Sequence, residues 1–342
     1  MILPGLIDVH VHLRVPGGEH KEDFHTGSAA ALAGGFTTLM AMPNTRPPLV
    51  TLSDWRIAQL AATRHSLCDV FLYAGASAAH LDELPALAEQ VPALKLYMDE
   101  TYGDLTVQGL DNLAAVFKAW PASKVLAVHA EDLSLAAAIS LSTTLPRPLH
   151  ICHVSRRAEI ELIARAKAKG FPVTCEVTPH HLFLTQKDAQ RLGALGLVRP
   201  PLADQSDQDA LWEHLGETID IIASDHAPHT LAEKGSTNPP CGVPGLESTL
   251  PLMLSAVSQE RLSMDRLRQL LYDNPRRIFN LPEQPETWIE VDPQEEYTFP
   301  MHPLYTKCGW SPFTHMPMTG CVKRVVLRGK EVFKDGVVLK SH

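Results

Sequence analysis

Five histidine and aspartate side chains stand at positions from which they could bind a metal ion. His10 and His12 alternate within one apolar run, so a β-strand would turn both imidazoles to the same face. His129 and His153 end two further apolar runs, and Asp225 follows another. An isolated His-x-His pair would equally suit hydrogen-bonded core histidines. Imidazoles together with a carboxylate, however, are donors that zinc and similar ions prefer, so the full set predicts a metal centre if the fold brings it together.

A lysine lies inside the apolar run of residues 93–98. Lys95 could simply extend its ammonium group to the surface. Burial near cations would instead lower its pKa, and a neutral amine can take up carbon dioxide to give a carbamate, which is an anion able to bridge two metal ions. The residues alone leave both interpretations open.

Alternating strand and helix patterns must position these side chains. Eight short apolar runs occupy residues 6–12, 37–42, 69–74, 93–98, 125–129, 149–154, 173–177 and 219–224. Between them lie Ala- and Leu-rich segments with the helical period, such as residues 157–167, which Gly170 ends. This order predicts the α/β class and a (β/α)8 TIM barrel, in which the carboxyl ends of the strands converge on one mouth. An open doubly wound sheet is the alternative, but no Gly-x-Gly-x-x-Gly or P-loop follows any strand.

The composition of the chain changes near its carboxyl end. From Trp288 onward the sequence becomes β-like, and it ends in two apolar segments joined around Arg328-Gly-Lys. We therefore expect a catalytic barrel over residues 6–285 and a small β-rich appendage made from residues 1–5 and 286–342.

The overall composition excludes several classes of protein. The 342 residues are 45% hydrophobic and 20% charged, with 27 Pro and 20 Gly, which rules out a disordered or fibrous chain. The formal charge of −9, without a basic stripe, argues against nucleic-acid binding, and no apolar stretch is long enough to span a membrane. Six scattered cysteines without C-x-x-C spacing, and a start that lacks a targeting signal, favour free thiols and a cytoplasmic location.

Over nearly its whole length the chain resembles the amidohydrolases, and within them the dihydroorotases. The resemblance is closest to the dihydroorotase domain of the animal multifunctional pyrimidine-synthesis protein. The motifs that carry it are GLIDVHVHLR at 5–14, MPNTRPP at 42–48, LKLY at 94–97, HICH at 150–153, CEVTPHH at 175–181, ASDHAPH at 223–229 and NPRRIF at 274–279. The resemblance implies the reversible, zinc-dependent cyclisation of N-carbamoyl-L-aspartate to L-dihydroorotate and water, in de novo pyrimidine biosynthesis.

The resemblance also implies a binuclear zinc site. One zinc would be held by His10, His12, Asp225 and carboxylated Lys95, and the other by Lys95, His129 and His153. A hydroxide shared by the two ions would attack the ring amide, with Asp225 as the general acid and base. A third zinc would use Cys152, Glu176 and the shared His10, although strand alternation predicts that Cys152 points away from His153.

Further residues are implied as contacts of the small-molecule substrate. Arg14 would bind the carboxylate that does not react, because a guanidinium matches a carboxylate in shape and charge. The remaining expected contacts are Asn44, His229, Arg199, Cys241 and, in a loop that closes over the substrate, Thr101 and Tyr102. The animal pattern has Phe where this chain has Tyr102, and Val15 replaces an acidic residue that usually follows Arg14.

Two other functions compete with this interpretation. A hydantoinase or allantoinase would use the same metal site on a different ring, and the predicted carboxylate contacts argue against it. A non-catalytic scaffold barrel would have lost metal ligands, whereas every expected ligand is present. The resemblance further predicts a homodimer and raises the prospect that this chain is one part of a multifunctional pyrimidine-synthesis polypeptide.

Overall fold

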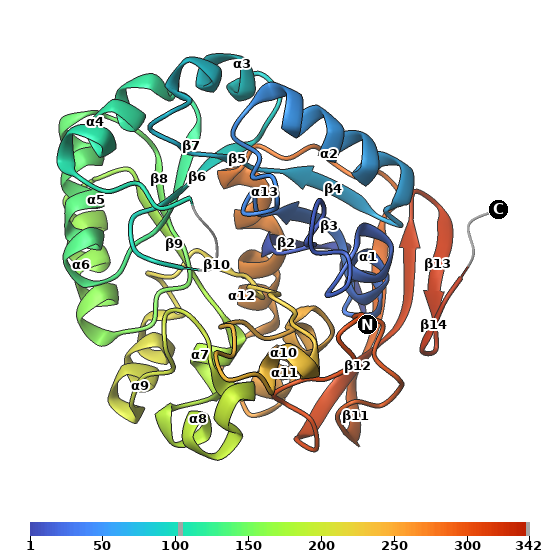
Figure 1. The fold of residues 1–342 in the computed structure, drawn as a ribbon. Coiled ribbons are helices and arrows are strands. Elements are labelled where there is room, and N and C mark those ends of the chain that lie inside the picture. Colours follow the sequence, from blue (N-terminus) through green and yellow to red (C-terminus); the bar gives the residue numbers. More distant parts are fainter. Residues whose placement is uncertain (102–104, 340–342) are drawn as a thin grey trace.

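A closed barrel of parallel strands forms the centre of the molecule (Figure 1). The structure is a computed structural model that describes residues 1–101 and 105–339. The barrel strands are β2 (Leu6–Val11), β3 (Phe36–Ala41), β4 (Asp69–Leu72), β5 (Ala74–Gly75), β6 (Ala93–Tyr97), β7 (Val125–His129), β8 (Leu149–Ile151), β9 (Val173–Val177) and β10 (Ile221–Ile222). They pair in the orders β2-β3-β4 and β5-β6-β7-β8-β9-β10. The predicted α/β barrel is confirmed.

Two short connections complete the ring. The run predicted as one strand over residues 69–74 divides into β4 and β5 at Tyr73, whose backbone N–H still donates to the Ala41 carbonyl at 3.0 Å. On the other side, Val11 forms a parallel bridge with His226, and the His12 N–H donates to the His226 carbonyl at 2.7 Å. The strand bearing the histidine pair therefore lies directly beside the segment that carries Asp225.

The strands are apolar along their length because both of their faces are covered. Every residue of β2, β3, β6 and β7 is buried. Inside the barrel, Val9, Met40 and Ala127 belong to one apolar cluster, which Phe279 and Leu281 complete. The segment that supplies these last two residues includes η3 (Gln269–Asp273) and α13 (Asn274–Ile278), and it packs against β2 and β10.

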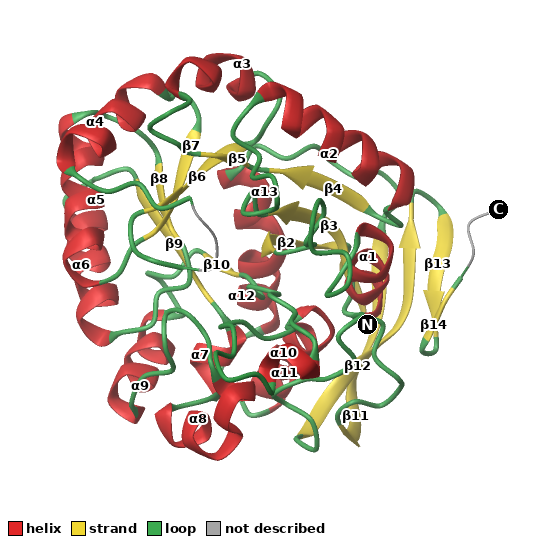
Figure 2. Cartoon of the chain, in the orientation of Figure 1, coloured by secondary structure: helices red, strands yellow, loops and turns green. Residues whose placement is uncertain are grey.

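Helices surround the barrel, as Figure 2 shows in red around the yellow strands. They are α1 (Phe24–Ala33), α2 (Leu52–His65), η1 (Leu81–Glu83), α3 (Leu84–Ala88), α4 (Leu110–Ala119), α5 (Asp132–Thr144), α6 (Arg157–Ala168), α7 (Pro179–Phe183), α8 (Gln186–Leu192), η2 (Gly193–Gly196), α9 (Gln205–His214), α10 (Leu231–Lys234), α11 (Leu246–Ser258) and α12 (Met264–Arg268). Helix α6 buries Ile160 and Ile163 and ends just before Gly170, whose φ of +78° is available to glycine without strain. This is the end that the sequence predicts.

A separate antiparallel sheet lies beside the barrel. Its order is β1 (Ile2–Pro4), β11 (Trp288–Thr298), β12 (Pro317–Leu327), β13 (Lys330–Lys334) and β14 (Val337–Val338). The hairpin expected around Arg328 joins β12 to β13, with Leu327 opposite Lys330. Strand β12 packs on α11, where a Cβ at Gly320 would come within 2.7 Å of Leu254 Cβ. Glycine therefore permits the close approach of sheet and helix.

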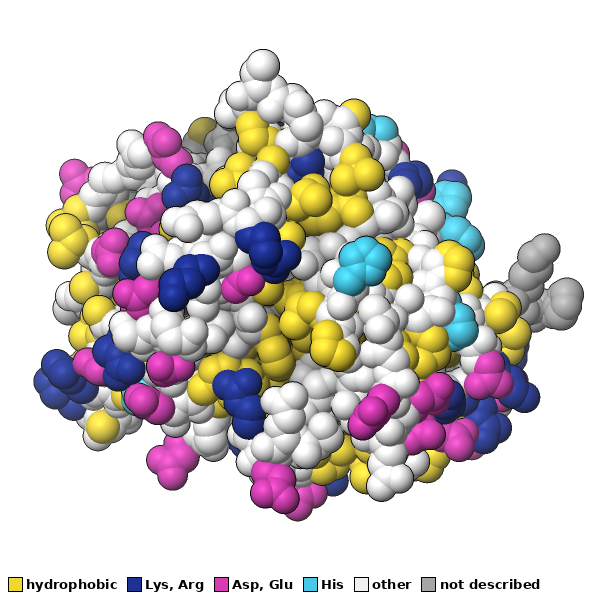
Figure 3. All heavy atoms as spheres, turned by 90° about the horizontal axis from the view of Figure 1, so that it is seen from below, with side chains coloured by type: hydrophobic (Ala, Val, Ile, Leu, Met, Phe, Trp, Pro, Cys, Tyr) yellow, Lys and Arg dark blue, Asp and Glu magenta, His cyan; other side chains and the backbone are white. Residues whose placement is uncertain are grey.

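The distribution of charged side chains and the free state of the cysteines agree with what the composition predicts. On the face drawn in Figure 3, acidic and basic side chains are interspersed. All six cysteines are free, and five of them are buried. Among the described residues, no helix is both long enough and apolar enough to pass through a membrane.

Candidate functional site

The first group of predicted ligands meets at the mouth of the barrel. His10 lies in β2 and His12 just beyond it, while Asp225 follows β10 on the neighbouring segment. Asp225 Oδ1 is 3.3 Å from His10 Nε2 and 3.1 Å from His12 Nε2. The three side chains are buried, and their ligand atoms lie within 4.8 Å of one another.

The second group of predicted ligands lies at the ends of the barrel strands β7 and β8. His129 ends β7, His153 follows β8, and the Nδ1 atom of His129 is 2.9 Å from the Nε2 atom of His153. The His153 ring is 5.2 Å from the His10 ring, measured between centroids, so the two groups adjoin. Lys95 in β6 is 0% exposed, and its Nζ atom lies 2.9 Å from Cys152 Sγ. The charge of Lys95 contributes to lowering the pKa of both His129 and His153, although burial is the larger cause for each.

Three of the predicted site residues have left-handed backbone conformations. The φ angles are +63° at Arg14, +35° at His153 and +43° at Asp225. Non-glycine residues seldom adopt this region, and such strain is concentrated at functional sites. Each of the three residues follows a barrel strand, where the turn redirects the side chain toward the mouth.

The expectation for Cys152 was wrong. Strand alternation predicted that its side chain would point away from that of His153, but Cys152 Sγ forms a compact group with His10 and Glu176 inside the barrel. The physical reason lies at His153: His150 and Cys152 both approach Glu176, as strand alternation requires, but the left-handed φ of +35° at His153 turns that side chain to the same side.

Polar contacts fix the rings of three of the histidines. Glu176 Oε1 lies 2.5 Å from His10 Nδ1, Asn44 Oδ1 lies 2.8 Å from His12 Nδ1, and Glu131 Oε1 lies 3.2 Å from His129 Nε2. Since a carboxylate or amide oxygen accepts, each ring donates an N–H to its partner and presents its other nitrogen to the mouth. This is the usual arrangement of a metal-binding histidine.

Sequence reasoning missed several of these contacts. Glu131 was not identified, although it follows His129 by two residues. His150 was noted only as part of a motif, yet its Nε2 is 3.1 Å from Glu176 Oε2. Asn44, expected as a substrate contact, lines the pocket and also bonds to His12, and this second contact was not predicted. The position of a histidine after a strand was a usable signal for a metal ligand. The sequence held no comparable signal for the group that contacts the second nitrogen of that histidine.

The charges of the site suit a cation between its ligands. Burial lowers the pKa of His12 to about 4, so its ring is neutral and its Nε2 lone pair faces an oxygen of Asp225. Burial and Lys95 act to lower the pKa of His10, but Glu176 and Asp225 outweigh them and raise it to about 10. For Asp225, burial acts to raise the pKa, yet the charge of His10 holds it well below its usual range. A bound metal ion would replace the proton on His10 Nε2. It would also satisfy the two acceptors that face each other, His12 Nε2 and Asp225 Oδ1.

A buried nitrogen also supports the fit of a metal. Within the described part of the chain, His153 Nδ1 is buried without a hydrogen-bond partner. The compact groups of candidate ligands are His10, His12 and Asp225, and His10, Cys152 and Glu176. Their nitrogen, oxygen and sulfur donors are those that zinc accepts.

A pocket of about 450 Å³ opens above the candidate ligands. It is lined by His10, His12, Arg14, Asn44, Tyr97, Thr101, His129, His153, Arg199, Asp225, Ala227, Cys241 and Gly242. Five of the seven predicted substrate contacts are therefore at the pocket wall, with Arg199 exposed and Thr101 and Cys241 partly exposed. Tyr102 lies outside the described residues.

The sixth predicted contact, His229, lies directly behind the pocket wall. Its Nε2 atom is 3.1 Å from Arg14 Nη2 and 3.0 Å from the Cys241 carbonyl oxygen, while Arg14 Nε donates to the Pro228 carbonyl at 3.2 Å. Burial, followed by the charges of Arg14 and Lys21, lowers the pKa of His229 to about 2, so the imidazole is neutral.

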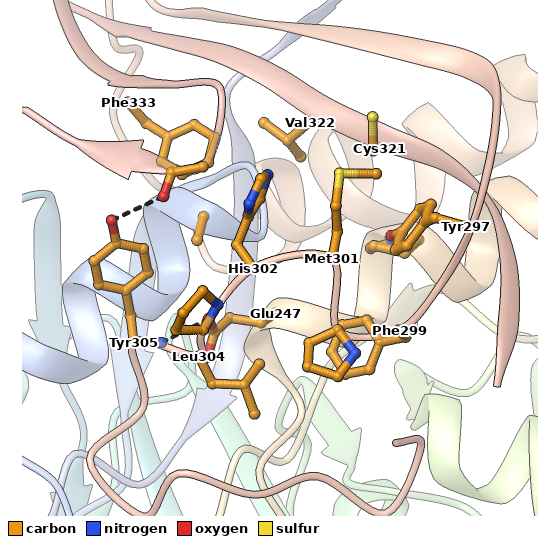
Figure 4. A pocket seen from close by; sticks show the side chains of 15 residues that line it. Glu247, Tyr297, Phe299, Met301, His302, Leu304, Tyr305, Cys321, Val322 and Phe333 are labelled. Carbon is orange, nitrogen blue, oxygen red and sulfur yellow. Dashed lines mark hydrogen bonds between the residues drawn. The ribbon is translucent and has the colours of Figure 1, made fainter. Parts of the chain in front are cut away.

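A second pocket lies between the barrel and the antiparallel sheet, away from these residues. It measures about 480 Å³ and is lined mostly by residues 297–305 together with Glu247 and Phe333 (Figure 4). In Figure 4, the Tyr305 hydroxyl donates to the Gly336 carbonyl at 3.0 Å, which links two segments of the sheet region. None of the predicted site residues that the structure describes lines this pocket.

Comparison with known proteins identifies similar chains. A family model described as "Dihydro-orotase-like" matches residues 1–144. The chain is 48% identical over 338 residues to the "Multifunctional protein CAD" of Squalus acanthias, covering 98% of this chain and 15% of that protein. It is 36% identical over 366 residues to a "Dihydroorotase" of Pyrococcus abyssi, covering 99% of this chain and 85% of the archaeal one. The chain thus spans about 15% of the length of the multifunctional relative.

Solved structures share the architecture. An L-hydantoinase (dihydropyrimidinase) from Arthrobacter aurescens has a TM-score of 0.94 at 26% identity, covering 99% of this chain and 87% of that one. The inactive dihydroorotase-like domain of the Chaetomium thermophilum CAD-like multifunctional protein has a TM-score of 0.84 at 28% identity, covering 99% and 96%.

Proposed function

Because the chain belongs to the dihydroorotase family, we propose that it catalyses the reversible cyclisation of N-carbamoyl-L-aspartate to L-dihydroorotate and water. The observation that carries the proposal is the juxtaposition of two functions in one pocket. The candidate metal ligands around Asp225 lie beside Arg14, which lines the same pocket and contacts His229 behind the pocket wall. The substrate has one amide that reacts and one carboxylate that does not, so it needs both.

Two zinc ions are proposed as the cofactor. His10, His12 and Asp225 would hold one ion, His129 and His153 the other, and carboxylated Lys95 would bridge them. Lys95 supports this assignment because an ammonium that is 0% exposed, with a thiol 2.9 Å away, is poorly compensated, whereas a carbamate would be neutralised by the metals. Bound zinc would polarise the amide carbonyl and lower the pKa of water.

The chain's own residues perform the remaining steps. Asp225 is placed to accept a proton at its carboxylate and return it to the ring nitrogen as the amide bond breaks, which is general acid-base catalysis. Arg14 donates hydrogen bonds to the carboxylate that does not react, with neutral His229 supporting it from behind, and this orients the ring. In the reverse direction the same groups hold carbamoyl aspartate while its carboxylate meets its carbamoyl nitrogen.

A third zinc is proposed at His10, Cys152 and Glu176, whose ligand atoms form a compact buried group. Binding there would require His10 Nδ1 to exchange its contact with Glu176 for the metal. We expect Cys152→Ala to reduce the zinc content by one ion. An unchanged zinc content would show that Glu176 only orients His10.

Two alternatives are distinguished by the same pocket. A hydantoinase would share the fold and the metal site, but its ring substrates carry no carboxylate that would require the pair of Arg14 and His229. A scaffold would resemble the inactive domain noted above, yet this chain retains every proposed ligand. Turnover of hydantoins in place of dihydroorotate would favour the first alternative, and absence of bound zinc would favour the second.

The reaction itself supplies a direct test. Ring closure consumes one proton, so the ratio of dihydroorotate to carbamoyl aspartate should fall about tenfold for each unit of pH increase near neutrality. The zinc-loaded chain should bring the mixture to the same ratio from either compound. Asp225→Asn should not. If neither compound is converted by the wild type at any pH, the proposed function is wrong.

The setting of the enzyme is part of the proposal. We propose a cytoplasmic homodimer that acts within a multifunctional pyrimidine-synthesis polypeptide, because the chain matches 98% of its length to one segment of such a protein. Archaeal relatives are similar over most of their own length, so independent activity of this unit is compatible with the match.

A further inference from the structure

Lys234 is a buried cation that the proposed reaction does not use. It ends the short helix α10 and is only 2% exposed. Its Nζ atom donates to the Leu197 carbonyl at 3.2 Å and to the Pro240 carbonyl at 2.9 Å, and it lies 5.6 Å from the centre of the Trp310 ring. Carbonyl oxygens and an indole face compensate a buried charge only in part, whereas methionine would fill the same space without a charge. The bonds that the ammonium group makes therefore call for a role.

The two carbonyl groups belong to different segments of the pocket wall. Leu197 precedes Arg199 by two residues, and Pro240 directly precedes Cys241. Arg199 and Cys241 both line the pocket, whereas Lys234 does not. The ammonium group thus joins the two segments from behind the wall.

A second bond joins the same segments but leaves one peptide group to Lys234. The Gly242 N–H donates to the Leu197 carbonyl at 2.8 Å. That bond does not hold the peptide group between Pro240 and Cys241, whose carbonyl accepts from Lys234. This peptide bond is trans, so its N–H points to the side opposite its carbonyl. Because the carbonyl is held from behind the wall, the Cys241 N–H is directed toward the pocket.

We propose that Lys234 is a positioning residue for substrate binding, because its ammonium group fixes the peptide group between Pro240 and Cys241 and so presents the Cys241 N–H at the pocket wall. This inference rests on the proposed function for the identity of the substrate. It extends that function by assigning a residue behind the wall that governs substrate affinity. Among the described residues, the contacts of Lys234 include no proposed zinc ligand, so its replacement should leave the metal centre intact.

The strength of these bonds depends on the proton of Lys234. Burial lowers the pKa of Lys234 to about 8, Arg14 adds to this effect, and Cys241 and Cys308 oppose it. Loss of the proton weakens both bonds, because charge-assisted hydrogen bonds are roughly twice as strong as neutral ones. KM for dihydroorotate should therefore rise about threefold to tenfold in the wild type between about pH 7 and about pH 9.

The other groups that face Lys234 are distinguished by their own ionisation. Arg14 stays charged, burial raises the pKa of Cys308 to about 11, and His229, with a pKa of about 2, stays neutral. The remaining group is the Cys241 thiol. Cys241→Ser should keep the rise of KM with pH, and Lys234→Met should abolish it. A rise of equal size in Lys234→Met, or its loss in Cys241→Ser, would contradict the role of Lys234.

Kinetics at one pH separate binding from the metal-dependent step. Lys234→Met keeps the length of the side chain and removes its donors. Near pH 7 we expect KM for dihydroorotate to rise about tenfold, the effect of losing one hydrogen bond to a charged group, with kcat and zinc content within about twofold of the wild type. Lys234→Arg, which keeps a cationic donor, should recover part of the loss.

Lys124→Met serves as the matched control. Lys124 is also partly buried, and its Nζ atom donates to the Val91 carbonyl at 2.7 Å. It directly precedes β7, at the end of that strand opposite to His129 and the mouth. This variant likewise loses a bond from a lysine to a backbone carbonyl, and KM should stay at the wild-type value.

Hydrogen exchange gives a readout that does not depend on the reaction. In the zinc-loaded protein without substrate, peptides covering residues 197–200 and 240–244 should exchange faster in Lys234→Met than in the wild type or Lys124→Met, while peptides from α6 should not change. Equal exchange in the two wall peptides, or an unchanged KM in Lys234→Met, overturns the proposal. Faster exchange in Lys234→Met together with a wild type that does not convert dihydroorotate would contradict the proposed function alone.

Discussion

At the scale of single residues, the candidate centre depends on groups that orient the ligands as well as on the ligands. Glu176, Asn44 and Glu131 each contact the nitrogen of a histidine that faces away from the mouth. Such contacts reduce the number of ring orientations that a metal must select, because each ring is already held by its partner. Loss of one partner should therefore weaken metal binding without removing a ligand.

Glu131→Gln tests this argument at His129. Glutamine keeps the size of the side chain at the start of α5 but removes the charge that holds the His129 N–H. We expect zinc affinity to fall about 10- to 100-fold, measured by competition with a chelator. The exposed Glu89→Gln serves as the control. Equal zinc affinities for Glu131→Gln and the wild type would show that this carboxylate does not support the centre.

The ligands could be predicted from the sequence, but their partners could not. His10, His129 and Asp225 follow from the rule that barrel strands end at one mouth. The partner of His10 is 166 positions away at Glu176, and that of His229 is 208 positions away at Lys21. Such pairs depend on how the loops return to the barrel, which no local pattern records. The orientation of Cys152 relative to His153 was mispredicted for a related reason, since the left-handed backbone of His153 interrupts strand alternation.

At the scale of elements, the antiparallel sheet is joined to the barrel by two carboxylates, the partly buried Glu247 and the fully buried Glu22. Glu247 in α11 accepts from the backbone N–H of Tyr305 at 2.8 Å, and both residues are labelled in Figure 4. It also accepts from the Thr306 N–H at 3.1 Å. Glu22 accepts from the Thr306 hydroxyl at 2.6 Å and from His226 Nε2 at 3.2 Å. Since His226 adjoins Asp225, the sheet side of the molecule contacts the segment that carries the proposed general base.

Glu247 should make the stability of the fold depend on pH. Burial raises its pKa from 4.5 to about 7. Below about pH 4.5 the group is protonated in both the folded and the unfolded chain. As pH rises toward 7, only the unfolded chain loses the proton, so the free energy of unfolding falls, by roughly 1–3 kcal/mol in total.

Glu247→Gln removes this ionisation and keeps an acceptor for Tyr305. Relative to the wild type, the variant should gain stability as pH rises from about 4.5 to 7, which is measured by urea denaturation across that range. The exposed Glu217→Gln provides the control. A stability difference between Glu247→Gln and wild type that is constant with pH would contradict the assignment.

At the scale of the whole molecule, the barrel class was predictable because eight apolar runs alternate with helices. The strand bounds were less so, since β10 contains only Ile221 and Ile222 of the run predicted over residues 219–224. Short barrel strands need few ladder bonds when neighbours on both sides hold them. The local sequence pattern therefore predicted the presence of each strand more accurately than it predicted the residue at which the strand ends.

The proposed homodimer is tested by sedimentation of the purified chain. The resemblance to dihydroorotases predicts twice the monomer mass of 37.6 kDa. Apolar side chains are exposed on the surface, among them Ile57 and Leu60, which lie three residues apart on α2. A sample that sediments only as monomer across a wide concentration range would remove the dimer from the account.

The central claim is that a zinc centre built around Lys95 acts on dihydroorotate. Its most direct test is the hydrolysis of dihydroorotate, followed by the ultraviolet absorbance of the ring amide, with zinc content determined on the same samples. We predict that the wild type and the exposed control Lys118→Ala carry at least two zinc ions and turn over, and that Lys95→Ala loses metal and activity together. A wild type that binds zinc but leaves dihydroorotate intact, or a Lys95→Ala variant that retains both zinc and activity, would contradict the claim.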